Sequence, residues 1–212
     1  AAEVVAEIEA AGGRARAFAA DLADEGESAG LVEAAASLGP VTCLVNNASV
    51  FEYDAAETAN RASWDAHMEV NLRAPLVLSQ AFAAALPDDR EGVIVNMLDQ
   101  RVANLTPHFL SYTVSKSALW TLTQTLAMAL APRIRVMAIG PGPTLPSARQ
   151  DEAAFARQVA ATPLARAVSL EEIRRALRFI LDAPSLTGQM IALDSGQHLG
   201  WRNAPTSDAD LE

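Results

Sequence analysis

Residues 111–116 have the sequence Ser-Tyr-Thr-Val-Ser-Lys, and the apolar run Ala-Leu-Trp follows at 118–120. Tyr112 and Lys116 are four residues apart, which places both side chains on one face of an α-helix, one turn apart. An ammonium group beside a phenol favours the phenolate, so we expect Lys116 to lower the pKa of Tyr112. Such a tyrosine can transfer a proton to or from a carbonyl or an imine. A solvated pair on an amphipathic helix is the competing interpretation, because this spacing is common by chance.

Composition narrows the class of protein. The chain has 212 residues, 50% of them hydrophobic and 20% charged, which predicts a single domain with a large core. The net charge of −10, without a basic tract, argues against nucleic acid or an anionic membrane as a partner. No apolar run approaches ~18 residues and no signal peptide is visible, so we expect a cytoplasmic protein without a membrane span. Cys43 is the only cysteine and the histidines lack metal-ligand spacing, so we expect neither a disulfide nor a metal site, and Cys43 to be buried in a strand.

Strand and helix patterns alternate along the chain. Short apolar runs predict strands at 14–20, 41–45, 92–97, 134–139 and 189–193. Helical patterns lie at 1–11, 28–38, 63–86, 112–131, 151–161 and 169–182. The alternation predicts a parallel α/β sheet with right-handed crossovers, and the run at 41–45 is typical of a strand buried on both faces. We expect one domain over residues 1–212, with a frayed polar tail at 203–212.

A proline interrupts the long helical pattern at 63–86. Pro75 has no N–H group, so the carbonyl of Asn71, four residues earlier, loses its helical partner. The sequence therefore predicts a kink near Asn71 and a carbonyl available to water, although a simple packing kink is an equal alternative.

Polar residues follow the predicted strands at the point where each strand ends. They are Asp21, Asn46-Asn47, Asp99 and Pro141-Gly142. Ligands of parallel α/β sheets bind beyond the carboxyl ends of the strands, so this convergence predicts a binding site there.

Five motifs, in this order, resemble those of the short-chain dehydrogenase/reductase family. They are Asp21-Leu22, Asn46-Asn47-Ala48-Ser49, Asn71, Tyr112-x-x-x-Lys116 and Pro141-Gly142. The resemblance implies a Rossmann-like, doubly wound parallel sheet that binds NAD(P)(H). It further implies that Tyr112 is the acid/base, that Lys116 binds the nicotinamide ribose and lowers the pKa of Tyr112, and that Asn71 holds a proton-relay water. The cofactor contacts that it implies, besides Tyr112 and Lys116, are Asp21, Leu22, Asn47, Ala48, Ser49, Pro141, Gly142 and Thr144. Because the family commonly assembles through two long helices, we expect a homotetramer or homodimer.

Asp99 departs from the family pattern. The family normally has a serine thirteen residues before the tyrosine, and this chain has Asp99 there. An ionised carboxylate would repel a developing alkoxide, whereas a carboxylic acid can protonate or hydrogen-bond a basic ring nitrogen. An aspartate at this place resembles the pteridine reductase branch, as do Thr162-Pro163-Leu164 and Leu193-Asp194-Ser195-Gly196. The resemblance implies reduction of a pterin-like or dihydrofolate-like substrate. We expect NADP(H) in preference to NAD(H), although the residues that discriminate between the two would follow the absent second strand. The alternative is a divergent carbonyl reductase of unknown substrate.

A second departure is an absence. The family's glycine-rich turn, which holds the cofactor pyrophosphate at a helix N-terminus, has no counterpart in residues 1–212. We expect a preceding segment to contain this turn with the first strand, the first helix and the second strand. The remaining alternative is a non-catalytic binding or assembly module.

Overall fold

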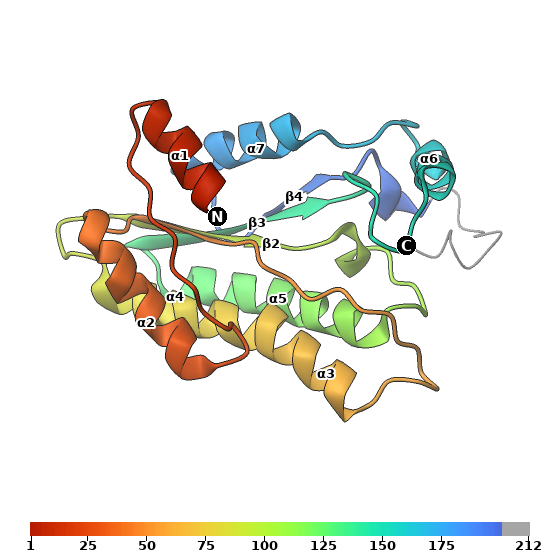
Figure 1. Ribbon diagram of the computed structural model, residues 1–212, viewed down its shortest axis with the longest axis horizontal. Helices are drawn as coiled ribbons and strands as arrows, with labels where there is room; N and C mark the ends of the chain where they lie inside the picture. The colour runs from red at the N-terminus through yellow and green to blue at the C-terminus, as the bar shows by residue number, and fades with distance from the viewer. Residues whose placement is uncertain (201–212) are drawn as a thin grey trace.

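The computed structural model describes residues 1–200, so the predicted tail at 203–212 lies outside the described residues. Parallel strands form one sheet in the order β1-β2-β3-β4 (Figure 1). The strands are β1 Cys43–Asn46, β2 Gly92–Met97, β3 Ile134–Pro141 and β4 Met190–Leu193. This arrangement confirms the expected single-domain, Rossmann-like parallel α/β fold.

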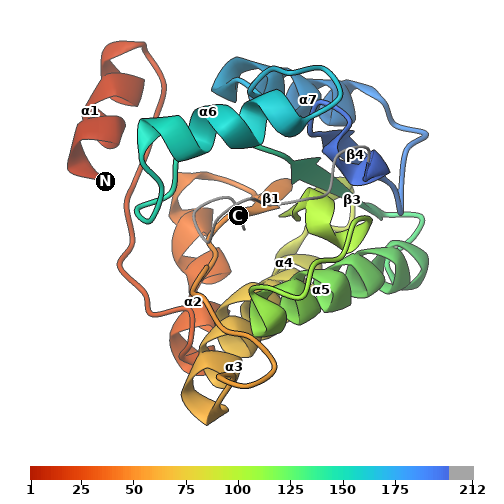
Figure 2. The same ribbon diagram turned by 90° about the vertical axis from the view of Figure 1, so that its right-hand side faces the viewer.

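Helices cover both faces of the sheet. The α-helices of the described chain are α1 Ala2–Ala10, α2 Glu25–Ala35, α3 Arg61–Met68, α4 Ala74–Ala85, α5 Leu110–Ala129, α6 Glu152–Ala161 and α7 Leu170–Asp182. Helices α2, α4 and α5 lie on one face and α7 on the other, while α6 lies near the carboxyl ends of the strands (Figures 1 and 2). Every helix within residues 1–200 is too short or too polar to cross a membrane.

Hydrophobic clusters lie on both faces of the sheet. On the face of α2, α4 and α5, Phe82 packs with Ile94 and Val136. On the opposite face, Ile180 of α7 packs with Val95 and Met137. Neighbouring residues of a strand point to opposite faces, so β2 and β3 contribute to both clusters. The two central strands are therefore held from both sides, which fixes the positions of their carboxyl ends.

The long helical pattern is interrupted where Pro75 predicts it. Residues Glu69–Arg73 form a π-helix between α3 and α4, and the N–H of Ala74 donates to the carbonyl of Glu69, five residues earlier. A π turn of this kind accommodates a residue that cannot continue the regular hydrogen-bond ladder. The predicted irregularity near Asn71 is confirmed.

Two expectations about the N-terminal part are wrong. Residues 14–20 form no strand, because no other described strand lies alongside to share ladder hydrogen bonds; instead, Arg14 donates to the carbonyl of Leu38. Strand β1 is not buried on both faces, since it is the edge of the described sheet, with Cys43 exposed and Val45 38% exposed.

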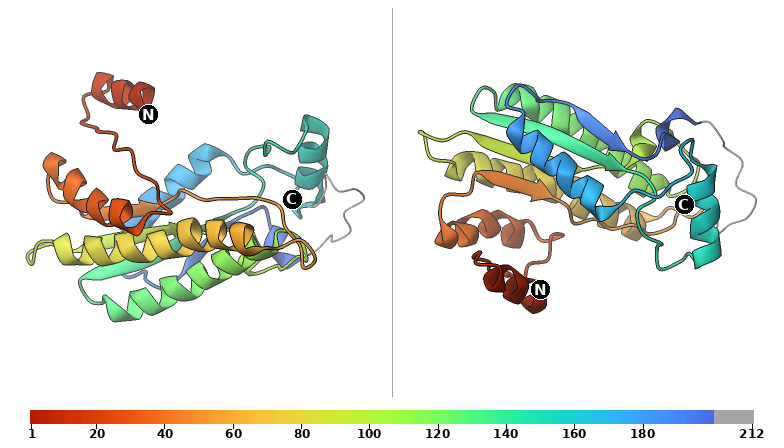
Figure 3. Two further views of the ribbon diagram at one scale, coloured as in Figure 1. Left: turned by 60° about the horizontal axis from the view of Figure 1, so that its bottom comes forward. Right: turned by 90° about the horizontal axis from the view of Figure 1, so that it is seen from above.

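Helix α1 projects from the rest of the molecule and buries none of its residues (Figure 3).

Candidate active site

Helix α5 brings Tyr112 and Lys116 to its buried face, 6% and 3% exposed. The Tyr112 hydroxyl donates to Oδ2 of Asp99, 2.9 Å away. Lys116 Nζ donates to the carbonyl of Met97, the last residue of β2, at 2.9 Å, and lies 5.8 Å from the centroid of the Tyr112 ring. The end of β2 and the first turns of α5 thus place a phenol, a carboxylate and an ammonium group together.

The expected effect of Lys116 on the tyrosine is wrong for this arrangement. Burial, then the negative charge of Asp99 and the hydrogen bond to it, raise the pKa of Tyr112 well above 10, while the charge of Arg101 works in the opposite direction. Burial lowers the pKa of Lys116 to about 8, partly offset by Asp99. Burial is the main physical reason, and orientation adds to it, since the phenol is directed to a carboxylate and Lys116 Nζ to a backbone carbonyl. Tyr112 is therefore a protonated donor here.

Asn71 connects the loop after β1 to α5. Its buried amide oxygen accepts from the N–H of Val50 (2.8 Å) and from Ser49 Oγ (3.1 Å). Its amide nitrogen donates to the carbonyl of Val50 (2.9 Å) and to Ser115 Oγ (3.1 Å). The side chain therefore braces Ser49 against the Tyr112 helix, while the role of Asn71 in holding a water stays a prediction.

A cavity of about 320 Å³ lies at the carboxyl ends of β2 and β3. Its walls include Phe51, Asp99, Pro141, Gly142 and Thr144. Thr144 Oγ1 donates to the carbonyl of Gly142 at 3.0 Å, which holds the turn after β3. A Cβ on Gly142 would lie 2.7 Å from a backbone atom of the turn that follows β4, so only glycine fits there. Four of the predicted site residues thus share one cavity with an aromatic ring.

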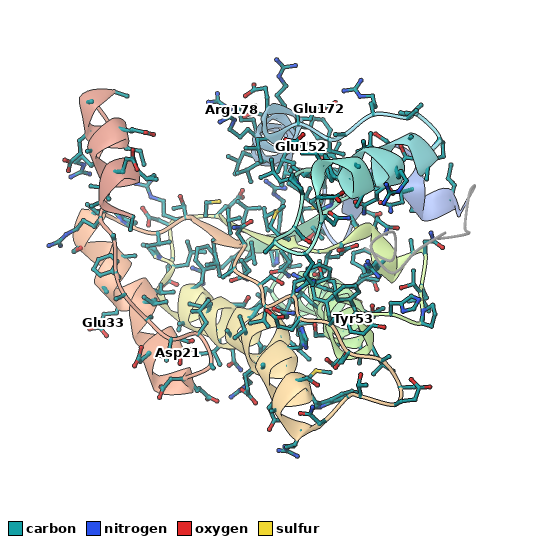
Figure 4. The ribbon with its side chains drawn as sticks, turned by 45° about the vertical axis from the view of Figure 1, so that its right-hand side comes forward. Asp21, Glu33, Tyr53, Glu152, Glu172 and Arg178 are labelled. Atoms are coloured by element: carbon teal, nitrogen blue, oxygen red, sulfur yellow. The ribbon has the colours of Figure 1, made fainter. Side chains whose placement is uncertain are left out.

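The remaining predicted cofactor residues lie elsewhere. Leu22, Asn47 and Ala48 line a mainly apolar groove of about 360 Å³ along β1. Asp21 uses Oδ1 to accept from the N–H of Ala23 and lies beside α2, well apart from Tyr53 near the start of α5 (Figure 4). The cavity and the groove both reach the carboxyl edge of the sheet, the groove after β1 and the cavity after β2 and β3. Both therefore lie where parallel α/β sheets bind their ligands.

Two buried features near Tyr112 were not predicted. Arg101, 3% exposed, lines the cavity, with its guanidinium carbon 5.1 Å from the centroid of the Phe109 ring and Nη1 donating to Thr106 Oγ1 at 2.8 Å. Asp54, 2% exposed, binds the first turn of α5. The sequence carries no periodic signal for either contact, since Asp54 and Ser111 are 57 residues apart in an irregular segment. Only the position of Arg101 directly after Asp99-Gln100 could have indicated the cavity.

Comparison with known proteins identifies the class. The family model for short chain dehydrogenase matches residues 1–156, and the chain therefore belongs to the short-chain dehydrogenase family of oxidoreductases. It is 31% identical over 200 residues to 2-(S)-hydroxypropyl-CoM dehydrogenase 3 of Xanthobacter autotrophicus, covering 87% of this chain and 77% of that protein.

Two crystal structures are more similar. FolM alternative dihydrofolate reductase 1 from Brucella canis, complexed with NADP, is 49% identical with a TM-score of 0.92, covering 97% of this chain and 82% of that chain. The protein of the same name from Brucella suis, in complex with NADP, is 51% identical with a TM-score of 0.92, covering 95% of this chain and 81% of that chain.

Proposed function

We propose that this chain is a reductase of a pterin-like or dihydrofolate-like substrate that uses NADPH. The observation that carries the proposal is the hydrogen bond from the Tyr112 hydroxyl to Asp99 Oδ2 (2.9 Å) at the cavity wall. Similarity to the two Brucella proteins, named as alternative dihydrofolate reductases and crystallised with NADP, supports both the substrate and the choice of NADP(H) over NAD(H).

Asp99 and Tyr112 supply the proton. Burial and the carboxylate keep Tyr112 protonated, and the hydrogen bond gives the proton a direct route to Asp99. Once Asp99 has taken this proton it is a carboxylic acid, which suits a basic ring nitrogen: giving the proton to the nitrogen restores the Asp99 carboxylate and leaves the phenolate on Tyr112. A ketone would instead develop an alkoxide facing that carboxylate, which is unfavourable because the two negative charges repel.

The chain's own residues account for cofactor positioning. When bound, the nicotinamide cofactor supplies the hydride. Pro141, Gly142 and Thr144 form the wall against which the nicotinamide would lie, and Lys116 is positioned at the end of β2 to bind its ribose. Leu22 and the 47–48 segment would hold the adenine in the groove along β1, with Asp21 beside it and Ser49 held by Asn71. Asn71 would keep this loop at a fixed distance from the Tyr112 helix.

A second candidate is a carbonyl reductase. It is favoured by the similarity to 2-(S)-hydroxypropyl-CoM dehydrogenase 3, whose name places its chemistry at an alcohol carbon. Asp99→Ser discriminates between the two candidates. A pterin reductase should lose pterin turnover because the proton donor to nitrogen is removed, whereas a carbonyl reductase should hold or gain ketone turnover.

The experiment is NADPH oxidation by the full protein with dihydrobiopterin, dihydrofolate and a panel of ketones, together with NADPH binding by fluorescence. We expect pterin-dependent oxidation, its loss in Tyr112→Phe, and retained NADPH binding in that variant. Unchanged turnover in Tyr112→Phe would refute the assignment of the proton donor. Absence of NADPH binding by the wild-type protein would favour the non-catalytic binding or assembly module.

We also propose a homotetrameric or homodimeric assembly in the cytoplasm. The proposal rests on the exposed apolar side chains of the long helix α5, among them Val114 (39% exposed) and Met128 (73% exposed). Light scattering on the full protein tests it, and a monomer would contradict it.

A further inference from the structure

The N-terminus of α5 is held by a residue that is far away in the sequence. The residue before the helix, Phe109, has a left-handed backbone (φ 56°) and a side chain that cannot accept a hydrogen bond. Asp54 takes over this role, since its carbonyl accepts from the N–H of Leu110 (3.1 Å) and its Oδ1 accepts from the N–H of Ser111 (3.0 Å). The first N–H groups of a helix otherwise lack partners, so Asp54 defines where α5 begins.

The carboxylate of Asp54 is fully engaged. Oδ2 accepts from Ser111 Oγ (2.5 Å) and from Ser63 Oγ of α3 (2.9 Å). Burial works to raise the pKa of Asp54, but its hydrogen bonds with Ser111 and then Ser63 outweigh burial and lower it, so the group is ionised. A negative charge at the N-terminus of a helix is also favoured by the helix dipole. Replacing this carboxylate by an amide would leave one of its donors facing an NH₂ group.

His67 extends the network to the loop that carries Phe51. His67 is fully buried on α3, and its Nε2 accepts from the N–H of Glu52 (3.1 Å). A backbone N–H can only donate, so the ring proton is on Nδ1, which lies 2.8 Å from the carbonyl of Ser63 and 2.7 Å from Ser111 Oγ. The His67 ring also meets the Tyr112 ring edge-on, with centroids 6.0 Å apart. Ser111, the residue before Tyr112, is thus fixed from two directions.

We infer that Asp54 is a positioning residue for proton transfer: by holding the first turn of α5 it sets the Tyr112 hydroxyl against Asp99. The expected effect on kcat rests on the proposed function. The expected effect on the first turn of α5 rests on the hydrogen bonds described above. The Tyr112 hydroxyl is 2.9 Å from Asp99 Oδ2, a distance at which a displacement of about 1 Å breaks the bond. The hydrogen bonds of Asp54 among the described residues go to Leu110, Ser111 and Ser63, none of which lines the cavity, so we expect Asp54 to act through the helix.

The test is a double-mutant cycle of Asp54→Asn with Tyr112→Phe, measured with NADPH and the pterin substrate. We expect Asp54→Asn to lower kcat by between about tenfold and about 100-fold with NADPH binding unchanged. In the Tyr112→Phe background it should lower the residual rate no further, because the hydroxyl that it positions is already absent. An equal fold-loss in both backgrounds would indicate a general structural role and overturn the inference.

The matched control is Asp65→Asn on the same helix as Ser63, where the carboxylate forms an exposed i,i+4 pair with Arg61. It should leave kcat unchanged, and a loss equal to that of Asp54→Asn would overturn the inference. If Asp54→Asn does not fold, Ser111→Ala decides, since it removes the hydroxyl link and keeps the Ser111 N–H bond. The inference is supported if Ser111→Ala lowers kcat in the protein that retains Tyr112 and not in the Tyr112→Phe variant. It is overturned if Ser111→Ala lowers kcat in neither protein, or equally in both.

Amide hydrogen exchange separates this inference from the proposed function. Exchange at Leu110 and Ser111, in the protein with NADPH bound, should accelerate in Asp54→Asn and stay unchanged in Asp65→Asn. This result needs no turnover. A wild-type protein that reduces no pterin would refute the proposed function alone, whereas unchanged exchange at the start of α5 would overturn the role of Asp54 alone.

Discussion

Removing the ammonium group of Lys116 should make the folded chain more stable at neutral pH. Burial lowers the pKa of Lys116 from 10.5 to about 8. One pKa unit is equivalent to about 1.4 kcal/mol, so keeping Lys116 charged in the folded state costs roughly 3 kcal/mol. Lys116→Met keeps the length and volume of the side chain but loses the hydrogen bond to the Met97 carbonyl, which costs about 1 kcal/mol. At pH 7 we therefore expect a net gain of roughly 2 kcal/mol in the free energy of unfolding.

The dependence on pH has a definite sign. Below about pH 8 Lys116 is protonated in both the folded and the unfolded chain, and the full cost is present. Between about pH 8 and 10.5 the folded chain releases the proton while the unfolded chain retains it, so stability rises with pH in the wild type. The gain from Lys116→Met should shrink over the same window and turn into a loss of about 1 kcal/mol above it, because the hydrogen bond to Met97 is still missing.

Urea unfolding of the cofactor-free protein at a series of pH values measures this effect. Lys116 is the only lysine among the 212 residues, so reductive ¹³C-methylation and NMR titration report its pKa without interference from other lysines. A Lys116→Met variant that is less stable at pH 7, or whose stability difference does not change with pH, would refute the reasoning. Such a result would mean that the ammonium group is solvated or paired in the folded state.

Three further outcomes are expected. Asp99→Asn removes the negative charge and the strong acceptor beside the phenol, so the pKa of Tyr112 should fall. Tyrosinate absorbance measures this pKa in a protein whose other tyrosine, Tyr53, is replaced by Phe. An unchanged or higher pKa contradicts the expectation. Asn71→Ala removes four hydrogen bonds, among them the buried one to Ser115 Oγ, and should destabilise the protein by about 2–4 kcal/mol in urea unfolding, whereas a loss below about 1 kcal/mol would show that water replaces the amide. Gly142→Ala places a Cβ 2.7 Å from a backbone atom and should cost about 1–3 kcal/mol and raise the KM for NADPH, and unaltered values of both would contradict the tight packing of this turn.

Periodicity and local chemistry were sufficient to predict most of the fold. The apolar run at 92–97 corresponds to β2, and the helical pattern at 169–182 corresponds to α7, which begins with a capping box of Ser169 and Glu172. Both depend on neighbours in the sequence, namely the alternation of a strand and the hydrogen bonds of one helical turn. Pro75 likewise predicts the irregularity near Asn71, because it lacks the N–H group that would continue the helical hydrogen bonds; the structure has a π-helix there. Residues 14–20 failed as a strand because a strand also needs a partner, which local sequence does not specify.

Within the candidate site, the sequence by itself determined which chemical groups are present: a tyrosine and a lysine one turn apart, and an aspartate at the end of the preceding strand. Tertiary structure alone decided how they act on one another. Burial, and then the charge and hydrogen bond of Asp99, raise the pKa of the Tyr112 phenol, while Lys116 is directed to a backbone carbonyl. The role of Asp54 could likewise not be predicted from the sequence, because only folding brings it to the start of α5. The reason is that electrostatic and hydrogen-bond energies depend on distance, direction and burial. Spacing along a helix fixes only which side chains lie one turn apart, and the tertiary structure fixes the rest.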